Sequence, residues 1–81
     1  MRFLLVDGPA HGGIYEHREM PLHTPQVTHH EGLAEHLYDR WVHSAPAPDG
    51  AYDAVFVHSA VRSDLVDRRC QAAVSEREKL V

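Results

Sequence analysis

The chain has 81 residues, of which 43% are hydrophobic and 25% charged, and 12 acidic against 8 basic side chains give a formal net charge of −4 at pH 7. Length and composition fit one globular domain over residues 1–81 and exclude a disordered chain. The acidic balance argues against a protein that binds nucleic acid, because such proteins need a surplus of clustered cations.

The first predicted element is a β-hairpin over residues 2–18. Branched and aromatic side chains in residues 2–6 are typical of a buried strand. Residues 7–13 hold three glycines and a proline, which indicate a turn before a returning strand. The apolar run of residues 3–6 is too short for a signal peptide or a membrane span, so we expect no membrane association.

A loop or a short helix is expected over residues 20–36. Pro21 and Pro25 prevent a full ladder of strand hydrogen bonds here. Residues 31–36 are compatible with one or two helical turns, which Gly32 weakens. The sequence leaves open whether residues 22–36 are ordered by themselves.

The second predicted hairpin spans residues 37–58. Its two strands are rich in aromatic and β-branched residues, and two prolines with an Asp-Gly pair lie between them. If residues 45 and 51 pair across the loop, Trp41 faces Val55. One face then holds Leu37, Trp41, Val55 and Val57, and the other holds Tyr38, Val42, Ala54 and Phe56. Both faces are apolar, so each must be covered.

A helix is predicted from about residue 61, or 64, to about residue 79. Apolar residues recur there at steps of three and four, namely Val61, Leu65, Val66, Cys70, Ala73 and Val74. Ser63 is the candidate N-cap. Cys70, the single cysteine, falls on this stripe, where a thiol behaves as a small hydrophobe rather than as a nucleophile. The expected fold is therefore α+β, with a small antiparallel sheet of two hairpins packed against one C-terminal helix.

Eight histidines are the most conspicuous feature of the composition. Four of them recur every six residues, at His11, His17, His23 and His29, but turns and prolines intervene. No His-x-x-x-His or Cys-x-x-Cys pair is present, so no metal ligand is assigned. A metal site assembled in three dimensions, or a pH switch, stays open as an alternative.

No catalytic or cofactor-binding residue is assigned. The glycine-bearing loop of residues 7–13 lacks the Gly-Lys-Ser/Thr ending of a phosphate-binding loop. Pairs of carboxylates such as Asp49 with Asp53 arise by chance among 12 acidic residues. We therefore expect no enzyme and no cofactor, and a small ligand in a pocket between hairpin and helix is not excluded.

The opening of the chain resembles small proteins of actinobacterial tailed phages. These begin with a strand, a Gly-Pro-x-x-Gly turn and a second strand, and continue with a proline-bearing stretch, a Tyr-x-Arg segment and a short strand. The matching segments here are Gly8-Pro9-Ala10-His11-Gly12, Pro21, Tyr38-Asp39-Arg40 and Val55-Phe56-Val57. The resemblance covers about the first 58 residues. Asp7 replaces the usual glycine, and the predicted helix lies outside the pattern. Those proteins are mostly uncharacterised, some are suspected virion components, and the resemblance implies no catalytic residue.

These observations together predict a small non-enzymatic phage-type structural or accessory protein that acts by protein–protein contact or self-association. A minor capsid, decoration or connector component fits, located in the cytoplasm or in a virion assembled there. The expected contact residues are Tyr38, Phe56, Leu80 and Val81. The alternatives are a soluble monomeric regulator that binds a host protein and a histidine-based metal-binding module.

Overall fold

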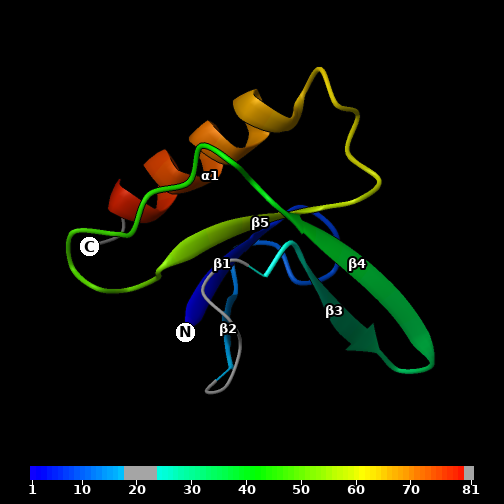
Figure 1. The fold of residues 1–81 in the computed structure, drawn as a ribbon. Coiled ribbons are helices and arrows are strands. Elements are labelled where there is room, and N and C mark those ends of the chain that lie inside the picture. Colours follow the sequence, from blue (N-terminus) through cyan, green and yellow to red (C-terminus); the bar gives the residue numbers. More distant parts are fainter. Residues whose placement is uncertain (18–23, 80–81) are drawn as a thin grey trace.

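A five-stranded sheet and one helix make up the described part of the chain, residues 1–17 and 24–79 of a computed structural model (Figure 1). The elements are β1 (Arg2–Val6), β2 (Ile14–Glu16), β3 (Gln26–Glu31), β4 (Ala34–Arg40), β5 (Ala54–His58) and α1 (Val66–Lys79). The sheet is mostly antiparallel and curls into a half-barrel, with α1 along one face. The predicted α+β class is confirmed.

The order of the strands in the sheet is β2-β1-β5-β4-β3, so β5 lies between the two hairpins. β1 and β5 run parallel, with Leu4 beside Val55 and Val6 beside Val57, whereas the other neighbours are antiparallel. The predicted antiparallel sheet of two hairpins therefore holds one parallel pair, β1 with β5, at the place where the two hairpins join. The physical reason is burial: both strands are continuous apolar runs, and a central position buries both of their faces.

The expected loop or short helix over residues 20–36 is wrong for its described part, since β3 and β4 form a regular antiparallel hairpin there. Their pairing ends at Glu31 opposite Ala34, which leaves Gly32 and Leu33 as a two-residue turn. Gly32 has a φ of 61°, and a glycine with positive φ at the first turn position is what a type II′ hairpin requires. The glycine that weakens a helix therefore makes the turn.

The predicted register between β4 and β5 is confirmed. Arg40 lies opposite Phe56, and the Trp41 amide donates a hydrogen bond to the Val55 carbonyl over 2.9 Å. Leu37 lies on β4 but is 39% exposed, and Val42 lies in a turn after the end of β4, where it is 82% exposed. The predicted N-terminal hairpin is also present, with Arg2 opposite Glu16.

Each face of the sheet has its own apolar cluster. The cluster under α1 holds Leu4, Val6, Trp41, Tyr52, Val55, Val57, Cys70 and Ala73. The cluster on the opposite face holds Phe3, Leu5, Val27, Tyr38, Ala54 and Phe56. Val27 on β3 and Phe3 on β1 share a cluster although two strands lie between them, so the curl of the sheet covers this face. The helix α1 thus covers one apolar face of the sheet, and the curl of the sheet covers the other.

The helix α1 begins at Val66 rather than at residue 61 or 64. A separate turn precedes it, in which the Leu65 amide bonds the Arg62 carbonyl over 2.9 Å. The first bond from inside α1 then runs from the Arg69 amide to the Leu65 carbonyl. That bond puts Ser63 before the helix start, so it does not occupy the N-cap position expected for it. Val61, part of the predicted stripe, still packs against the core from the turn.

Candidate functional site

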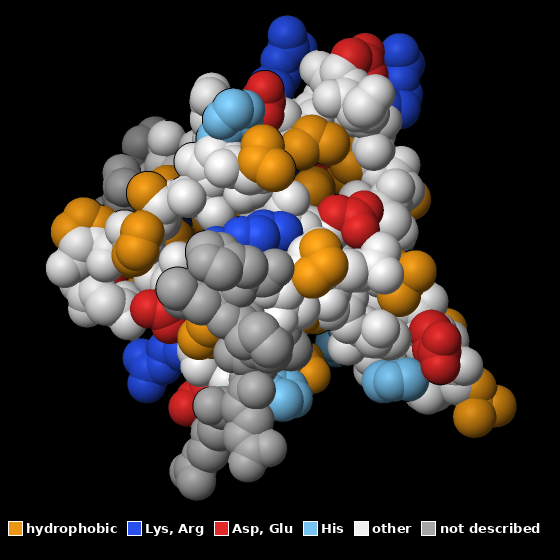
Figure 2. Space-filling view, in the orientation of Figure 1, with side chains coloured by type: hydrophobic (Ala, Val, Ile, Leu, Met, Phe, Trp, Pro, Cys, Tyr) orange, Lys and Arg blue, Asp and Glu red, His pale blue; other side chains and the backbone are white. Residues whose placement is uncertain are grey.

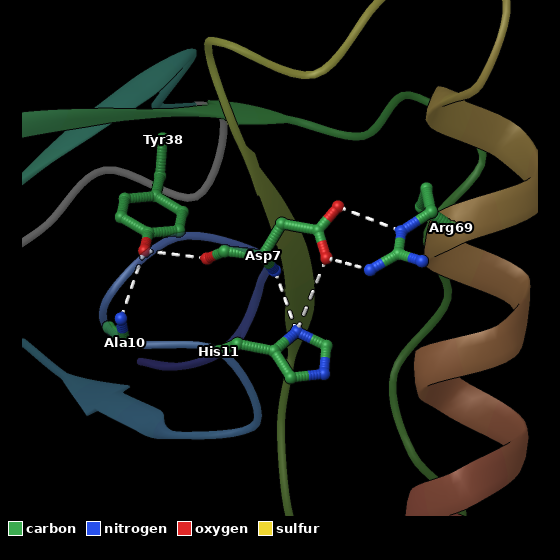
Figure 3. A network of polar contacts seen from close by, with 5 residues as sticks. All are labelled: Asp7, Ala10, His11, Tyr38 and Arg69. Atoms are coloured by element: carbon green, nitrogen blue, oxygen red, sulfur yellow. Dashed lines mark hydrogen bonds and ion pairs between the residues drawn. The ribbon is translucent and has the colours of Figure 1, made fainter.

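Polar side chains from four segments meet where the parallel strands β1 and β5 end (Figure 3). Asp7 follows β1, and His11 comes from the turn before β2. Tyr38 points in from β4, and Arg69 reaches across from α1. Because distant parts of the chain bring an acid, a base, a phenol and an imidazole together here, this cluster is the first place to look for chemistry.

Asp7 is held as a carboxylate by Arg69. The Arg69 Nε donates to Asp7 Oδ2 over 2.9 Å, and Nη2 bonds the other carboxylate oxygen. The Arg69 hydrogen bond is the main reason that the pKa of Asp7 lies below its usual value, and burial opposes it. Asp7 also has a φ of 63°, in the left-handed region that aspartate tolerates better than most residues. A carboxylate so paired is a poor general base.

The phenol of Tyr38 holds the loop after β1. Its hydroxyl donates to the Asp7 carbonyl over 2.8 Å and accepts from the Ala10 amide over 3.2 Å. Burial raises the pKa of Tyr38, so the hydroxyl stays protonated at neutral pH. His11 Nδ1 accepts a hydrogen bond from the Asp7 amide over 2.7 Å, which leaves the proton of a neutral ring on Nε2.

These bonds favour a structural role for the cluster. The carboxylate is paired with a guanidinium, the phenol is saturated with backbone partners, and one nitrogen of His11 is occupied. The cluster therefore fastens the turn after β1 to β4 and α1.

A second polar pair, His36 and His58, bridges β4 and β5. His36 Nδ1 lies 3.0 Å from His58 Nε2, and the Ala60 amide donates to His58 Nδ1 over 3.1 Å. The Ala60 bond puts the His58 proton on Nε2, which then donates to His36. A histidine that binds a metal through one ring nitrogen instead donates the proton of its other ring nitrogen to a carboxylate or a backbone carbonyl. Among the described residues no group of three or more His, Cys, Asp or Glu could hold a metal ion.

A hollow of about 580 Å³ lies between α1 and the connection from β4 to β5. It is lined by Trp41, His43, Ala45, Pro46, Pro48, Tyr52, Val55, Gln71, Val74 and Ser75. It lies between the second predicted hairpin and the helix, where the sequence left open a pocket for a small ligand. Its lining holds no Asp, Glu, Lys or Arg, so it offers no charged group to orient a polar ligand.

The structure buries two of the four residues expected to contact a partner. Tyr38 and Phe56 are both 0% exposed and belong to the cluster inside the curl. This corrects their assignment: their side chains pack in the core, and the folded chain leaves them no surface for a partner. Leu80 and Val81 lie outside the described residues, and their contact role stays a prediction.

Two of the four large exposed hydrophobic side chains among the described residues lie on the β3–β4 hairpin, and the other two are Ile14 on β2 and Val42 after β4. Leu33 at its turn is fully exposed, and Leu37 on β4 is 39% exposed. The hairpin extends away from α1 (Figure 1), and Figure 2 shows a projecting arm with hydrophobic atoms at its end. The signal in the sequence that could have indicated this hairpin is the Gly32-Leu33 pair, because a glycine at the first position is typical of a two-residue hairpin turn.

Comparison of the chain with protein-family models, curated proteins and solved structures gave no significant match. Within the described residues, no helix combines the length and the apolar character needed to cross a membrane.

Proposed function

We propose that this protein is non-enzymatic and acts by protein–protein contact through its β3–β4 hairpin. The observation that carries the proposal is the complete exposure of Leu33 at the tip of a hairpin that projects from the core. A fully exposed leucine at a projecting tip gains free energy when a partner removes it from water.

The proposed role is structural or accessory, as a component of a larger protein assembly. The resemblance to small phage proteins supports a particle component such as a minor capsid, decoration or connector protein. A place in the cytoplasm, or in a virion assembled there, belongs to the same proposal. The small size of the chain supports it too, because a thin core benefits from burial against a neighbour.

The test compares two variants of the purified protein. Leu33→Ser combined with Leu37→Thr removes the apolar surface of the hairpin, and Val42→Thr is the matched control because Val42 is 82% exposed outside the hairpin. We expect the double variant to lose self-association, measured by light scattering, or capture of a partner by the immobilised chain. The control retains both. Equal behaviour of the two variants contradicts the proposed contact surface.

The proposed alternatives predict other results. A soluble regulator is a monomer that captures one host protein, and its acidic charge suits a basic partner surface. A metal-binding module retains metal when purified without a histidine tag, and elemental analysis measures that directly.

A further inference from the structure

The two edges of the sheet are protected to different degrees. β2 has three residues, whereas β3 has six and includes no proline, glycine, lysine or arginine. Short edges and edges with proline or lysine resist pairing with another chain, and a long regular edge favours it. In the described part of the chain β3 has a strand neighbour on one side only. Among the described residues β3 is therefore the longer of the two edges and the one without these protections.

The hydrogen bonds to β4 determine which backbone groups of β3 point outward. The Arg40 amide donates to the Pro25 carbonyl over 2.9 Å, which makes this a hydrogen-bonded pair. Such pairs alternate along an antiparallel ladder. With Val27 opposite Tyr38 and His29 opposite His36, these two β3 residues bond β4. The N–H and C=O groups of Gln26, Thr28 and His30 therefore point away from the sheet.

We propose that β3 pairs antiparallel with β3 of a second copy of this chain, with Thr28 opposite Thr28 at the two-fold axis. This inference rests on the proposed function and names its partner. In this register each outward-pointing residue meets another: Gln26 faces His30 of the second copy and Thr28 faces itself. If the two-fold axis lay at His29 instead, Gln26 would lie opposite Gly32 of the second copy, which is in the turn and not on the strand. An isologous contact of this kind closes with two copies.

The side chains fit the same register. Val27 faces His29 of the second copy, and threonines in opposed positions form favourable cross-strand pairs. No two acidic and no two basic side chains are opposed along β3. Its one carboxylate, Glu31, lies 3.2 Å from His29 Nε2 of its own strand. The net charge of −4 is therefore not concentrated along β3. A second copy of the strand meets no strong electrostatic repulsion at this edge.

The first experiment measures absolute mass by light scattering over a range of concentrations. We expect a dimer, with twice the 9.2 kDa of one chain. Thr28→Pro removes the outward N–H without removing a bond to β4, and we expect it to weaken the dimer at least about tenfold. Thr28→Val is the matched control and stays dimeric. Thermal unfolding of both variants checks that each is folded.

Cysteine cross-linking tests the register independently of that variant. Residues opposite each other in a hydrogen-bonded pair have Cα atoms about 5.5 Å apart, within reach of a disulfide. Thr28→Cys should therefore form a covalent dimer on mild oxidation. Gln26→Cys alone should not, whereas a mixture of Gln26→Cys and His30→Cys should.

The outcomes separate this inference from the proposed function. Three results overturn the pairing. They are a wild-type protein with the mass of one chain at every concentration, a Thr28→Pro variant that is as dimeric as wild type, and a Thr28→Cys variant that forms no cross-links. If the hairpin double variant still loses capture of another protein, the proposed contact function stands without self-pairing. If the hairpin double variant changes nothing, the proposed contact through Leu33 and Leu37 fails, and the Thr28 variants still decide the pairing because it uses the backbone of β3.

Discussion

Arg69 on α1 and Asp7 after β1 lie 62 positions apart in the sequence and are joined by a hydrogen bond of 2.9 Å between Nε and Oδ2. The Asp7 side chain is 16% exposed and that of Arg69 is 52% exposed. The pair therefore lies at the rim of the molecule, where it ties the helix to the sheet. It also fixes the one described non-glycine residue with a positive φ.

The first prediction concerns stability in acid. The pKa of Asp7 is lowered in the folded state, chiefly by Arg69. A lowered pKa contributes stability above the unfolded value of 3.8, and that contribution is lost as the pH falls through the folded value. Between about pH 5 and pH 2, urea unfolding should show a steeper loss of stability for wild type than for Asp7→Asn. Asparagine tolerates the positive φ, and Asp64→Asn, on the exposed surface, is the control. Parallel pH profiles for wild type and Asp7→Asn contradict the assignment.

The second prediction concerns Gly8. Its φ is 69°, and a Cβ placed there would lie 2.4 Å from His58 Cδ2 and 2.7 Å from the Tyr38 hydroxyl. Gly8→Ala should destabilise the fold by at least about 2 kcal/mol in chemical unfolding, from the backbone conformation and the steric clash together. Gly12→Ala is the matched control, since Gly12 has a φ of 80° with nothing within 4 Å. It should show the backbone effect alone, about 1 kcal/mol. An equal loss for the two variants would remove the steric explanation.

The third prediction concerns the contact between Trp41 and α1. The indole Nε1 donates to Asp67 Oδ1 over 2.8 Å, and the indole is buried. Trp41→Phe removes this donor and part of the packing, so unfolding should cost about 1–2 kcal/mol less than in wild type. Asp67→Asn keeps an acceptor for the indole and should lose less. If Asp67→Asn is the more damaging change, charge rather than the hydrogen bond carries the contact.

The fourth prediction concerns the thiol of Cys70. Burial is the main cause that raises the pKa of Cys70 to about 12. Because the thiolate is the reactive form, alkylation at pH 8 should be on the order of a thousandfold slower in the native protein than in denaturant. Labelling followed by mass spectrometry measures both rates. Fast labelling of the folded chain would place Cys70 outside the core.

The sequence alone determines the local elements whose signals are short in range. Apolar steps of three and four place Cys70 on the buried face of the helix, and the assumed pairing of residues 45 and 51 across the loop sets Trp41 opposite Val55. Residues 26–36 could not be assigned in this way. They carry histidines and carboxylates, β3 is an edge strand, and Gly32 is compatible with both a weak helix and a tight turn.

Only the tertiary structure decides what the elements do to one another. It inserts β5 beside β1, curls the sheet until Phe3 and Val27 share a cluster, and so buries Tyr38 and Phe56, which the sequence offered as surface. An aromatic residue on a strand has the same sequence pattern whether its face is covered or open. Which face is covered depends on long-range pairing and curvature, and those are fixed by the burial of the whole chain rather than by any local period.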